Sequence, residues 1–236
     1  MPSIQAVSTT NRLLDVLTSE DRQHLMAHCE MVRLVLADVL SNPGDPIRHV
    51  YFPINSVISL VKPIDGGGNL EVGLIGNEGM LGITLMLGVD VTPFRALVQG
   101  AGAALRITAP AFLREIEQSR GLQRELQRYL YVSFSQLMQT AVCNRFHLIE
   151  ERLARLLLMI RDRVHAMEFH ITQELLAQML GVRRVGVTKA ACSLQEKKLI
   201  SYSRGDVRIH NIIGLEAISC ACYRADKETY DRILQC

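Results

Sequence analysis

The chain has 236 residues, of which 48% are hydrophobic, and this is enough for two modest domains that each bury a core. Its formal net charge is only +2. No stretch approaches the ~20 consecutive apolar residues that cross a bilayer, and the N-terminus lacks the basic start and apolar run of a secretory signal. We therefore expect a cytoplasmic protein of two domains, in which the six dispersed cysteines are reduced.

The positive charge is concentrated in one part of the chain. Residues 145 to 210 hold 12 Lys and Arg against 7 Asp and Glu, which gives a net charge of +5. Residues 1 to 144 hold 11 against 13, and residues 211 to 236 hold 3 against 4. A locally basic domain is typical of a protein with a polyanionic partner, although a solvated helix face gives the same excess.

The first 107 residues predict two short helices followed by a β-domain. Leucines recur between residues 11 and 30, where Thr18 can serve as an N-cap, and this fits two short helices. From residue 31 to about 107, short β-branched runs alternate with turn residues, including the glycines at 66 to 68, which are typical of a hairpin turn. Many short strands with regular turns indicate a sandwich or barrel.

A helical pattern replaces the strands after Pro110 and continues to about Val164. Apolar residues at three- and four-residue intervals predict one face of a long helix, and these residues are Leu126, Leu130, Phe134, Leu137 and Ala141. The stripe can pack on the chain's own β-domain or pair with its copy in a second subunit. We favour the dimer interface, because a long helix between two domains has little intramolecular surface to cover it.

The next helix, residues 148 to 164, is expected to have one apolar and one charged face. The apolar face comprises Leu153, Leu156, Leu157 and Ile160. The arginines are expected to face solvent, and they are Arg152, Arg155, Arg161 and Arg163.

Residues 171 to 192, ITQELLAQMLGVRRVGVTKAAC, have the pattern of a helix-turn-helix. This motif needs a small residue where the helices cross, a glycine with positive φ at the turn, and apolar residues between the helices. Ala177 and Gly181 meet the first two requirements. The interior positions hold Leu176, Leu180, Val182, Val187 and Ala190. Thr172 is a plausible N-cap, at a helix start that can approach a phosphate.

The outward residues of the second helix suit duplex DNA. Arg184 and Lys189 can donate to guanine O6 and N7, and Val185 can contact a thymine methyl group. Arg183 and Thr188 suit phosphate. The alternative interpretation is a helical hairpin with a solvated basic edge.

A two-stranded hairpin is predicted directly after this motif. Residues 199 to 203 and 207 to 210 read as strands joined at Arg204-Gly205-Asp206, where the glycine favours a tight turn. Such a hairpin is a wing, and either Arg204 at its tip or Lys198 at its base can contact the DNA backbone.

The chain resembles the CRP/FNR superfamily of bacterial transcription regulators from residue 11 to residue 213. The resemblance is strongest in EERLARLLLMI, in ITQELLAQMLGVRRVGVTKAACSLQEKKLISYSRGDVRI and in VGLIGNEGMLG. It implies an α+β fold with a cyclic-nucleotide-binding-like β-roll, similar to a jelly roll, as a sensor domain in residues 1–119. A dimerisation helix in 120–147 and a winged helix-turn-helix DNA-binding domain in 148–236 complete the expected organisation.

The resemblance also implies partners and roles. We expect a homodimer that binds a pseudo-palindromic operator in double-stranded DNA, with RNA polymerase as a further partner. Arg184 and Lys189 occupy positions that read bases in the family. Val185 stands where well-known members carry a glutamate, so the target sequence is expected to differ from theirs.

Family members that bind cyclic AMP share a sequence motif, a Gly-Glu pair followed by Arg-Ser or Arg-Thr. The predicted sensor domain of this chain departs from that motif. In those members, the glutamate holds the ribose hydroxyl and the arginine holds the cyclic phosphate. Here Glu78 is shifted by one residue and Thr92 occupies the arginine position, while Arg95 can substitute only if the loop is rearranged. These three are the candidate effector residues. We expect no cyclic AMP binding of the usual kind and assign no cofactor, which leaves the effector open.

The cysteines raise two further kinds of site, an iron–sulfur cluster and a metal centre. The usual iron–sulfur cluster is excluded because Cys29 is the only early cysteine. Cys143 and His147 lie one helical turn apart, and Cys220 and Cys222 also offer metal ligands. We recognise no second pair of fixed spacing among them, and cysteine often packs as a small hydrophobe, so no metal is assigned.

No nucleophile elbow, P-loop or H-E-x-x-H spacing appears in the sequence, so an enzyme is not expected. The remaining alternative is a ligand-sensing module that acts on a protein partner and has lost DNA recognition.

Overall fold

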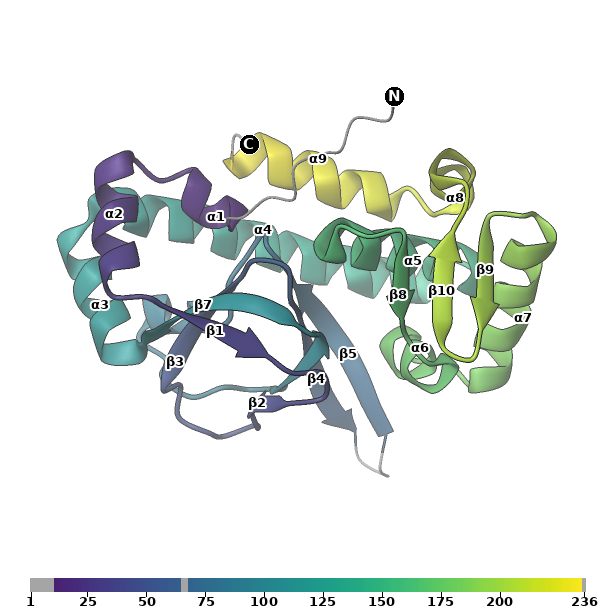
Figure 1. Ribbon diagram of the computed structural model, residues 1–236, viewed down its shortest axis with the longest axis horizontal. Coiled ribbons are helices and arrows are strands. Elements are labelled where there is room, and N and C mark those ends of the chain that lie inside the picture. The colour runs from purple at the N-terminus through teal and green to yellow at the C-terminus, as the bar shows by residue number, and fades with distance from the viewer. Residues whose placement is uncertain (1–10, 65–67, 235–236) are drawn as a thin grey trace.

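The computed structural model describes residues 11–64 and 68–234 of the chain. A β-domain and a winged domain lie along one long helix, which gives the α+β fold expected from the sequence (Figure 1). Of the glycine turn expected at 66 to 68, residues 66 and 67 lie outside the described part.

The β-domain begins with the two short helices α1 (Arg12–Asp15) and α2 (Ser19–Ala27). Thr18 caps α2 as expected, because its hydroxyl accepts a hydrogen bond from the amide of Asp21 at 3.1 Å. The strands that follow are β1 (Glu30–Leu34), β2 (Val39–Ser41), β3 (His49–Pro53), β4 (Val57–Ile64), β5 (Gly68–Ile75), β6 (Arg95–Gly100) and β7 (Gly102–Thr108), with the 3-10 helix η1 (Ile83–Leu87) between β5 and β6.

These strands form two antiparallel sheets, ordered β1-β7-β3 and β2-β6-β4-β5. In the main core of the β-domain, the rings of Phe52 and Phe112 pack edge to face with their centroids 6.2 Å apart.

Three helices connect the two domains: α3 (Ala109–Gln118), α4 (Arg120–Phe146) and α5 (Ile149–Val164). The Ser119 hydroxyl starts α4 by accepting a hydrogen bond from the amide of Leu122 at 2.9 Å. With 27 residues, α4 is about 40 Å long and runs behind both domains in Figure 1. No helix in the described residues combines the length and apolar character needed to cross a membrane.

The winged domain contains β8 (Glu168–His170), α6 (Gln173–Leu180), α7 (Arg184–Glu196), β9 (Ile200–Ser203) and β10 (Asp206–Ile209). The hairpin β9–β10 was expected, but β8 was not, and it adds a third strand in the order β8-β10-β9. Three residues are too few for a periodic signal. The core joins α5 to the winged domain through Leu157, Leu176 and Val187.

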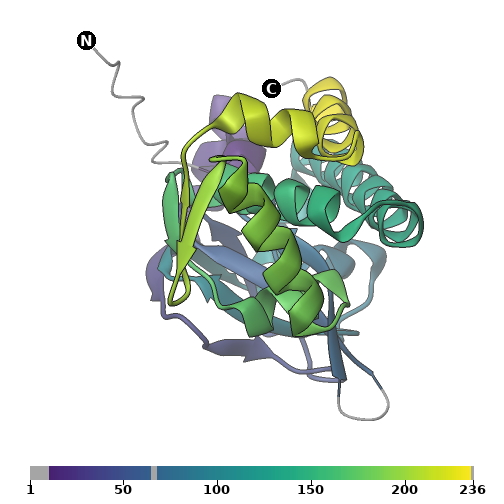
Figure 2. The same cartoon turned by 90° about the vertical axis from the view of Figure 1, so that its right-hand side faces the viewer.

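The last two helices, α8 (Ile212–Ile218) and α9 (Cys222–Leu234), return the chain to the β-domain. Figures 1 and 2 show α9 lying along α4. Tyr230 and Leu234 are buried in the same core as Leu13 and Phe52. The predicted domain limits at residues 119 and 147 stay predictions. The predicted organisation did not include the packing of α9 against the β-domain.

Candidate DNA interface and sensor cavity

The helix-turn-helix has the local geometry that its sequence predicts. Thr172 caps α6 by accepting a hydrogen bond from the amide of Leu175 at 3.2 Å. Gly181 has φ 62° and ends α6 in the left-handed conformation that favours glycine. Ala177 is buried, and its carbonyl accepts a hydrogen bond from the amide of Val182 at 3.0 Å. The turn between the helices is therefore fixed by short-range contacts.

The start of α7 presents its basic side chains to solvent. Arg183 is the N-cap, Arg184 opens the helix, and Val185 is 60% exposed. Within the described residues, no ion pair involves Arg183, Arg184 or Lys189. These cations are available for an external anion.

Thr188 is only partly exposed, and its hydroxyl is already engaged. It donates to Gln173 Oε1 at 2.7 Å and approaches the Arg184 carbonyl oxygen at 3.1 Å. A phosphate contact through this hydroxyl has to compete with those two partners.

The turn between β9 and β10 lies at the same end of the winged domain as α6 (Figures 1 and 2). Arg204 and Gly205 form it with φ of 52° and 93°. The amide of Ile171 donates to the Gly205 carbonyl at 2.7 Å, which holds the turn beside Thr172. Lys198 lies just after the C-terminal end of α7. This 13-residue helix is about 20 Å long, so Lys198 is that far from the helix start. The structure thus separates Lys198 from the wing tip.

The β-domain contains a cavity of about 670 Å³ that extends to α4. Its lining includes apolar side chains of β3, β4 and β5 and the α4 residues Phe134 and Leu137. Of the three candidate effector residues, Thr92 alone lines it. The Thr92 hydroxyl donates to the Phe94 carbonyl at 3.1 Å, which closes a local turn.

Glu78 and Arg95 do not join Thr92, so the expected three-residue effector site is corrected. Arg95 is exposed on β6. The carboxylate of Glu78 pairs with Arg163 at 2.7 Å and also accepts a hydrogen bond from the amide of Gly76 at 3.2 Å. Its oxygens therefore face α5 and the loop's own backbone.

The arginines of α5 are another correction. Arg152, Arg155 and Arg163 are only 7%, 6% and 6% exposed, although the helical pattern predicted that they face solvent. Only Arg161 is partly exposed, and it pairs with the neighbouring Asp162. The reason is that α5 contacts α4, α9, the β-domain and the winged domain, which leaves it little free surface.

Each buried arginine connects α5 to a different part of the molecule. Arg152 donates to Asn144 Oδ1 at 2.8 Å and to the carbonyl oxygen of Leu180. Arg155 pairs with Asp226 of α9 at 2.6 Å. Arg163 pairs with Glu78 of the β-domain. These contacts join α9 and the loop around Glu78 to the helix that packs against the winged domain.

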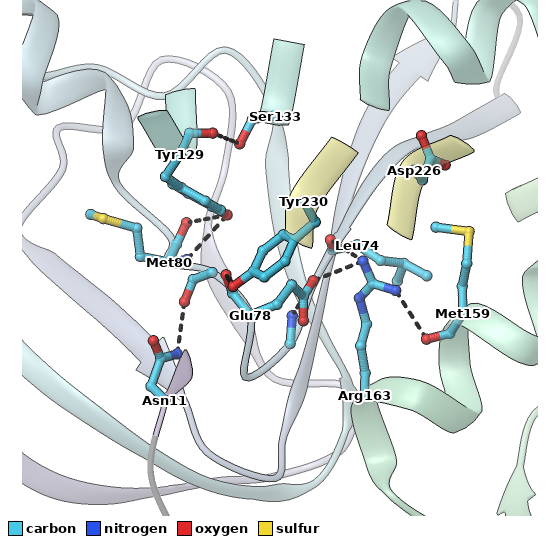
Figure 3. A network of polar contacts seen from close by, with 12 residues as sticks. Asn11, Leu74, Glu78, Met80, Tyr129, Ser133, Met159, Arg163, Asp226 and Tyr230 are labelled. Atoms are coloured by element: carbon cyan, nitrogen blue, oxygen red, sulfur yellow. Dashed lines mark hydrogen bonds and ion pairs between the residues drawn. The ribbon is translucent and has the colours of Figure 1, made fainter. Parts of the chain in front are cut away.

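The loop at residues 76–79 is the centre of this connection (Figure 3). Tyr230 of α9 donates its hydroxyl to the Glu78 carbonyl at 2.7 Å, and Tyr129 of α4 accepts a hydrogen bond from the amide of Met80 at 3.1 Å. Burial raises the pKa of Tyr129 to about 12, so its hydroxyl stays protonated. A Cβ on Gly79 would lie 2.1 Å from the Tyr129 hydroxyl, so only glycine permits this close approach.

Glu71 of β5 is a partly buried acid that no sequence pattern singled out. Ser59 donates a hydrogen bond to its carboxyl group at 2.5 Å. Burial raises the pKa of Glu71 to about 8 against the opposing effects of Ser59 and Arg163, so this acid is protonated in the folded protein near neutral pH.

Replacing Glu71 by Gln is expected to stabilise the protein at pH 8 by about 1–2 kcal/mol. The folded state holds a proton that the unfolded state loses above about pH 4.5, so the native acid loses stability as the pH rises from there to about 8. The neutral amide avoids this loss. Urea unfolding between pH 5 and pH 8 measures the difference, and the exposed Glu117→Gln is the control. A constant difference across that range would show that Glu71 does not keep its proton.

The apolar stripe of α4 divides into a covered and an open part. Leu126 is buried in the core of its own chain, so its predicted place in a dimer interface is corrected. Phe134 and Leu137 are 59% and 49% exposed, Ala141 is exposed, and Leu130 is partly exposed. Tyr131, Met138 and Val142 extend the open part. We call this exposed set the α4 strip.

Comparison with known proteins agrees with this geometry. Residues 151–218 match the family model of the Crp-like helix-turn-helix domain. The Global nitrogen regulator of Nostoc sp. is 24% identical over 185 residues, which cover 73% of this chain and 82% of that protein.

Two solved structures show the same fold. FixK2 from Bradyrhizobium japonicum has a TM-score of 0.70 at 12% identity, with 82% of this chain and 98% of that chain covered. The c-di-GMP responsive global regulator CLP from Xanthomonas campestris has a TM-score of 0.62 at 18% identity, with 82% of this chain and 100% of that chain covered.

A β-rich sensor domain joined by one long helix to a winged helix-turn-helix defines a DNA-binding transcription regulator, not an enzyme. Residues 151–218 are a Crp-like helix-turn-helix domain, and the chain as a whole is similar to regulators of the CRP/FNR family. The helix-turn-helix is the DNA-binding part of the chain, and regulators of this kind are typically dimeric.

Proposed function

We propose that the chain acts as a homodimer on a pseudo-palindromic DNA site, with the start of each α7 in the major groove. The supporting observation is that Arg183, Arg184 and Lys189 are exposed along the first half of α7. Within the described part of the chain they form no ion pair. Cations that are not neutralised by the protein's own acids can displace the counterions of DNA phosphates. In a dimer with its two-fold axis at the α4 strip, we expect the two α7 helices to lie about 34 Å apart, which is one turn of duplex.

The placement of each side chain suggests its role. We assign Arg184 and Lys189 to base edges and Val185 to an apolar contact with a base. Arg183, Arg204 and the α6 start at Thr172 are assigned to phosphate. Thr188 and Lys198 contribute least, because the first is engaged by Gln173 and the second lies at the far end of α7.

We infer that the cavity beside α4 is the effector site. Its volume of about 670 Å³ lies within the ~300–1,000 Å³ of small-molecule sites. The lining offers two arginines, and Arg155 is already paired with Asp226, while Arg48 is exposed. Cyclic AMP held through Glu78 and a buried phosphate-binding arginine does not fit this arrangement. A cytoplasmic location and contact with RNA polymerase are proposed on the family resemblance alone.

Replacing Arg184 by Ala tests the DNA interface. After sequences bound by the native protein are selected from random duplex DNA, the variant is expected to bind the selected site about 10- to 100-fold more weakly, because one bidentate base contact is worth about 1–3 kcal/mol. Fluorescence anisotropy at fixed salt measures the affinity. Arg224→Ala on α9 is the matched control, because it removes the same charge from an exposed side chain outside the winged domain.

Two results would contradict the proposal. Equal affinity of Arg184→Ala and Arg224→Ala for the selected site would remove Arg184 from base reading. Failure to select any sequence, with all binding lost at high salt, would favour a module that acts on a protein partner instead.

A further inference from the structure

Three cysteines and a histidine from distant parts of the chain converge at the junction of α4, α8 and α9. Cys143 and His147 come from the end of α4, and Cys220 and Cys222 precede and open α9. The four ligand atoms all lie within 4.8 Å of one another. The Cys143 and Cys220 sulfurs are 3.5 Å apart, and the Cys222 sulfur lies 3.4 Å from His147 Nδ1.

These distances fit a tetrahedral metal site. A zinc ion with Zn–S bonds of ~2.3 Å has its sulfur ligands about 3.8 Å apart. In the sequence, only Cys143 and His147 form a pair at helical spacing. The structure supplies the second pair, Cys220 and Cys222, which the Cys-x-Cys spacing could have signalled.

Simple hydrophobic packing does not account for the cluster. The three buried thiols form a small group separate from the hydrophobic cores of the described residues. Their neighbours are polar: Gln139 Nε2 donates to the Cys222 sulfur at 2.9 Å, and the His147 ring faces the same sulfur. No disulfide joins the cysteines of the described chain. A single disulfide would also leave the third thiol and the imidazole without a role.

The charges around the cluster suit a bound metal ion. Three thiolates, one neutral imidazole and one divalent cation carry a net charge of −1. Arg152 is buried beside Cys143 and has no carboxylate partner in the part of the chain that the structure describes. A buried guanidinium needs a compensating anion, and a thiolate-rich metal centre supplies one.

We propose that Cys143, His147, Cys220 and Cys222 bind one zinc ion in a closed structural site. Thiolate and imidazole ligands select zinc over magnesium or calcium, which prefer oxygen. Such a site fastens the start of α9 to the end of α4, next to the start of α5, the helix that packs against α6 and α7 of the winged domain.

The metal content of the full chain tests this proposal. Protein purified anaerobically with reductant is expected to contain one zinc ion per chain by inductively coupled plasma mass spectrometry. Cys143→Ser and Cys222→Ser are expected to contain a small fraction of one. Cys192→Ser is the matched control, because this thiol is exposed on α7 and lies outside the cluster, and it is expected to keep the full content.

Cobalt spectroscopy separates loss of a ligand from loss of folding. Metal-free native protein titrated with Co²⁺ is expected to show the intense visible bands of tetrahedral cobalt and thiolate-to-cobalt charge transfer. His147→Cys keeps four ligands, so it is expected to bind one ion with a spectrum shifted toward that of four sulfurs.

Specific results would overturn the zinc site. One is that the native protein contains no metal and gives no tetrahedral cobalt spectrum. Another is that Cys222→Ser and Cys192→Ser, both shown to be folded by circular dichroism, contain equal amounts of metal. The third is that metal-free protein kept anaerobic contains a Cys143–Cys220 disulfide.

Discussion

Replacing Phe134 by Asp is expected to convert the proposed dimer into a monomer of 26.4 kDa and to weaken binding of its DNA site by about 10²- to 10⁴-fold. Phe134 lies at the centre of the α4 strip and is 59% exposed in the single chain. A carboxylate there costs the free chain little, but it would be buried without a partner in a dimer. A monomer contacts only one half of the DNA site, so it loses the increase in affinity that a dimer gains by binding both halves at once.

Light scattering and fluorescence anisotropy measure the mass and the affinity. Since Phe134 also lines the cavity, Met138→Asp should give the same result, because Met138 belongs to the α4 strip but not to the cavity lining. Met31→Asp places the same charge on an exposed apolar position of the edge strand β1 and should leave both quantities unchanged. A Phe134→Asp protein that stays dimeric would move the interface away from α4.

Replacing Arg155 by Met is expected to lower the free energy of unfolding by about 3–5 kcal/mol. Arg155 and Asp226 form a buried ion pair at 2.6 Å between α5 and α9. Burial raises the pKa of Asp226 against the attraction of Arg155, so the carboxylate depends on this partner to stay charged. Removing Arg155 leaves the Asp226 carboxylate buried without a compensating positive charge.

Urea unfolding at pH 7 measures this loss. Arg161→Met is the matched control on the same helix, because Arg161 is partly exposed and pairs with its neighbour Asp162, and it should cost under about 1 kcal/mol. Adding Asp226→Leu to Arg155→Met should recover much of the loss, since both charges are then absent. Equal effects of the two arginine substitutions would show that the Arg155–Asp226 pair is not the source of stability.

The elements that the sequence predicted correctly are those determined by interactions between residues close together in the chain. The N-cap at Thr172, the buried Ala177 and the left-handed Gly181 all lie within ten residues, and their spacing alone defines the turn. The β-domain followed for the same reason, because alternating short strands and turn residues are visible segment by segment. The outward cations of α7 follow from helical periodicity once that turn is set.

Only the tertiary structure decided how α5 and its surroundings are arranged. Helical spacing makes Arg155 look like a solvent-facing residue, because charged side chains are rarely buried without a partner. Its partner, Asp226, lies 71 residues away, and no local pattern relates the two. The same is true of Glu78 with Arg163 and of Cys143 with Cys220, which are 77 residues apart. Local spacing determines elements and turns, whereas the pairing of polar groups across elements depends on contacts that exist only after the chain has folded.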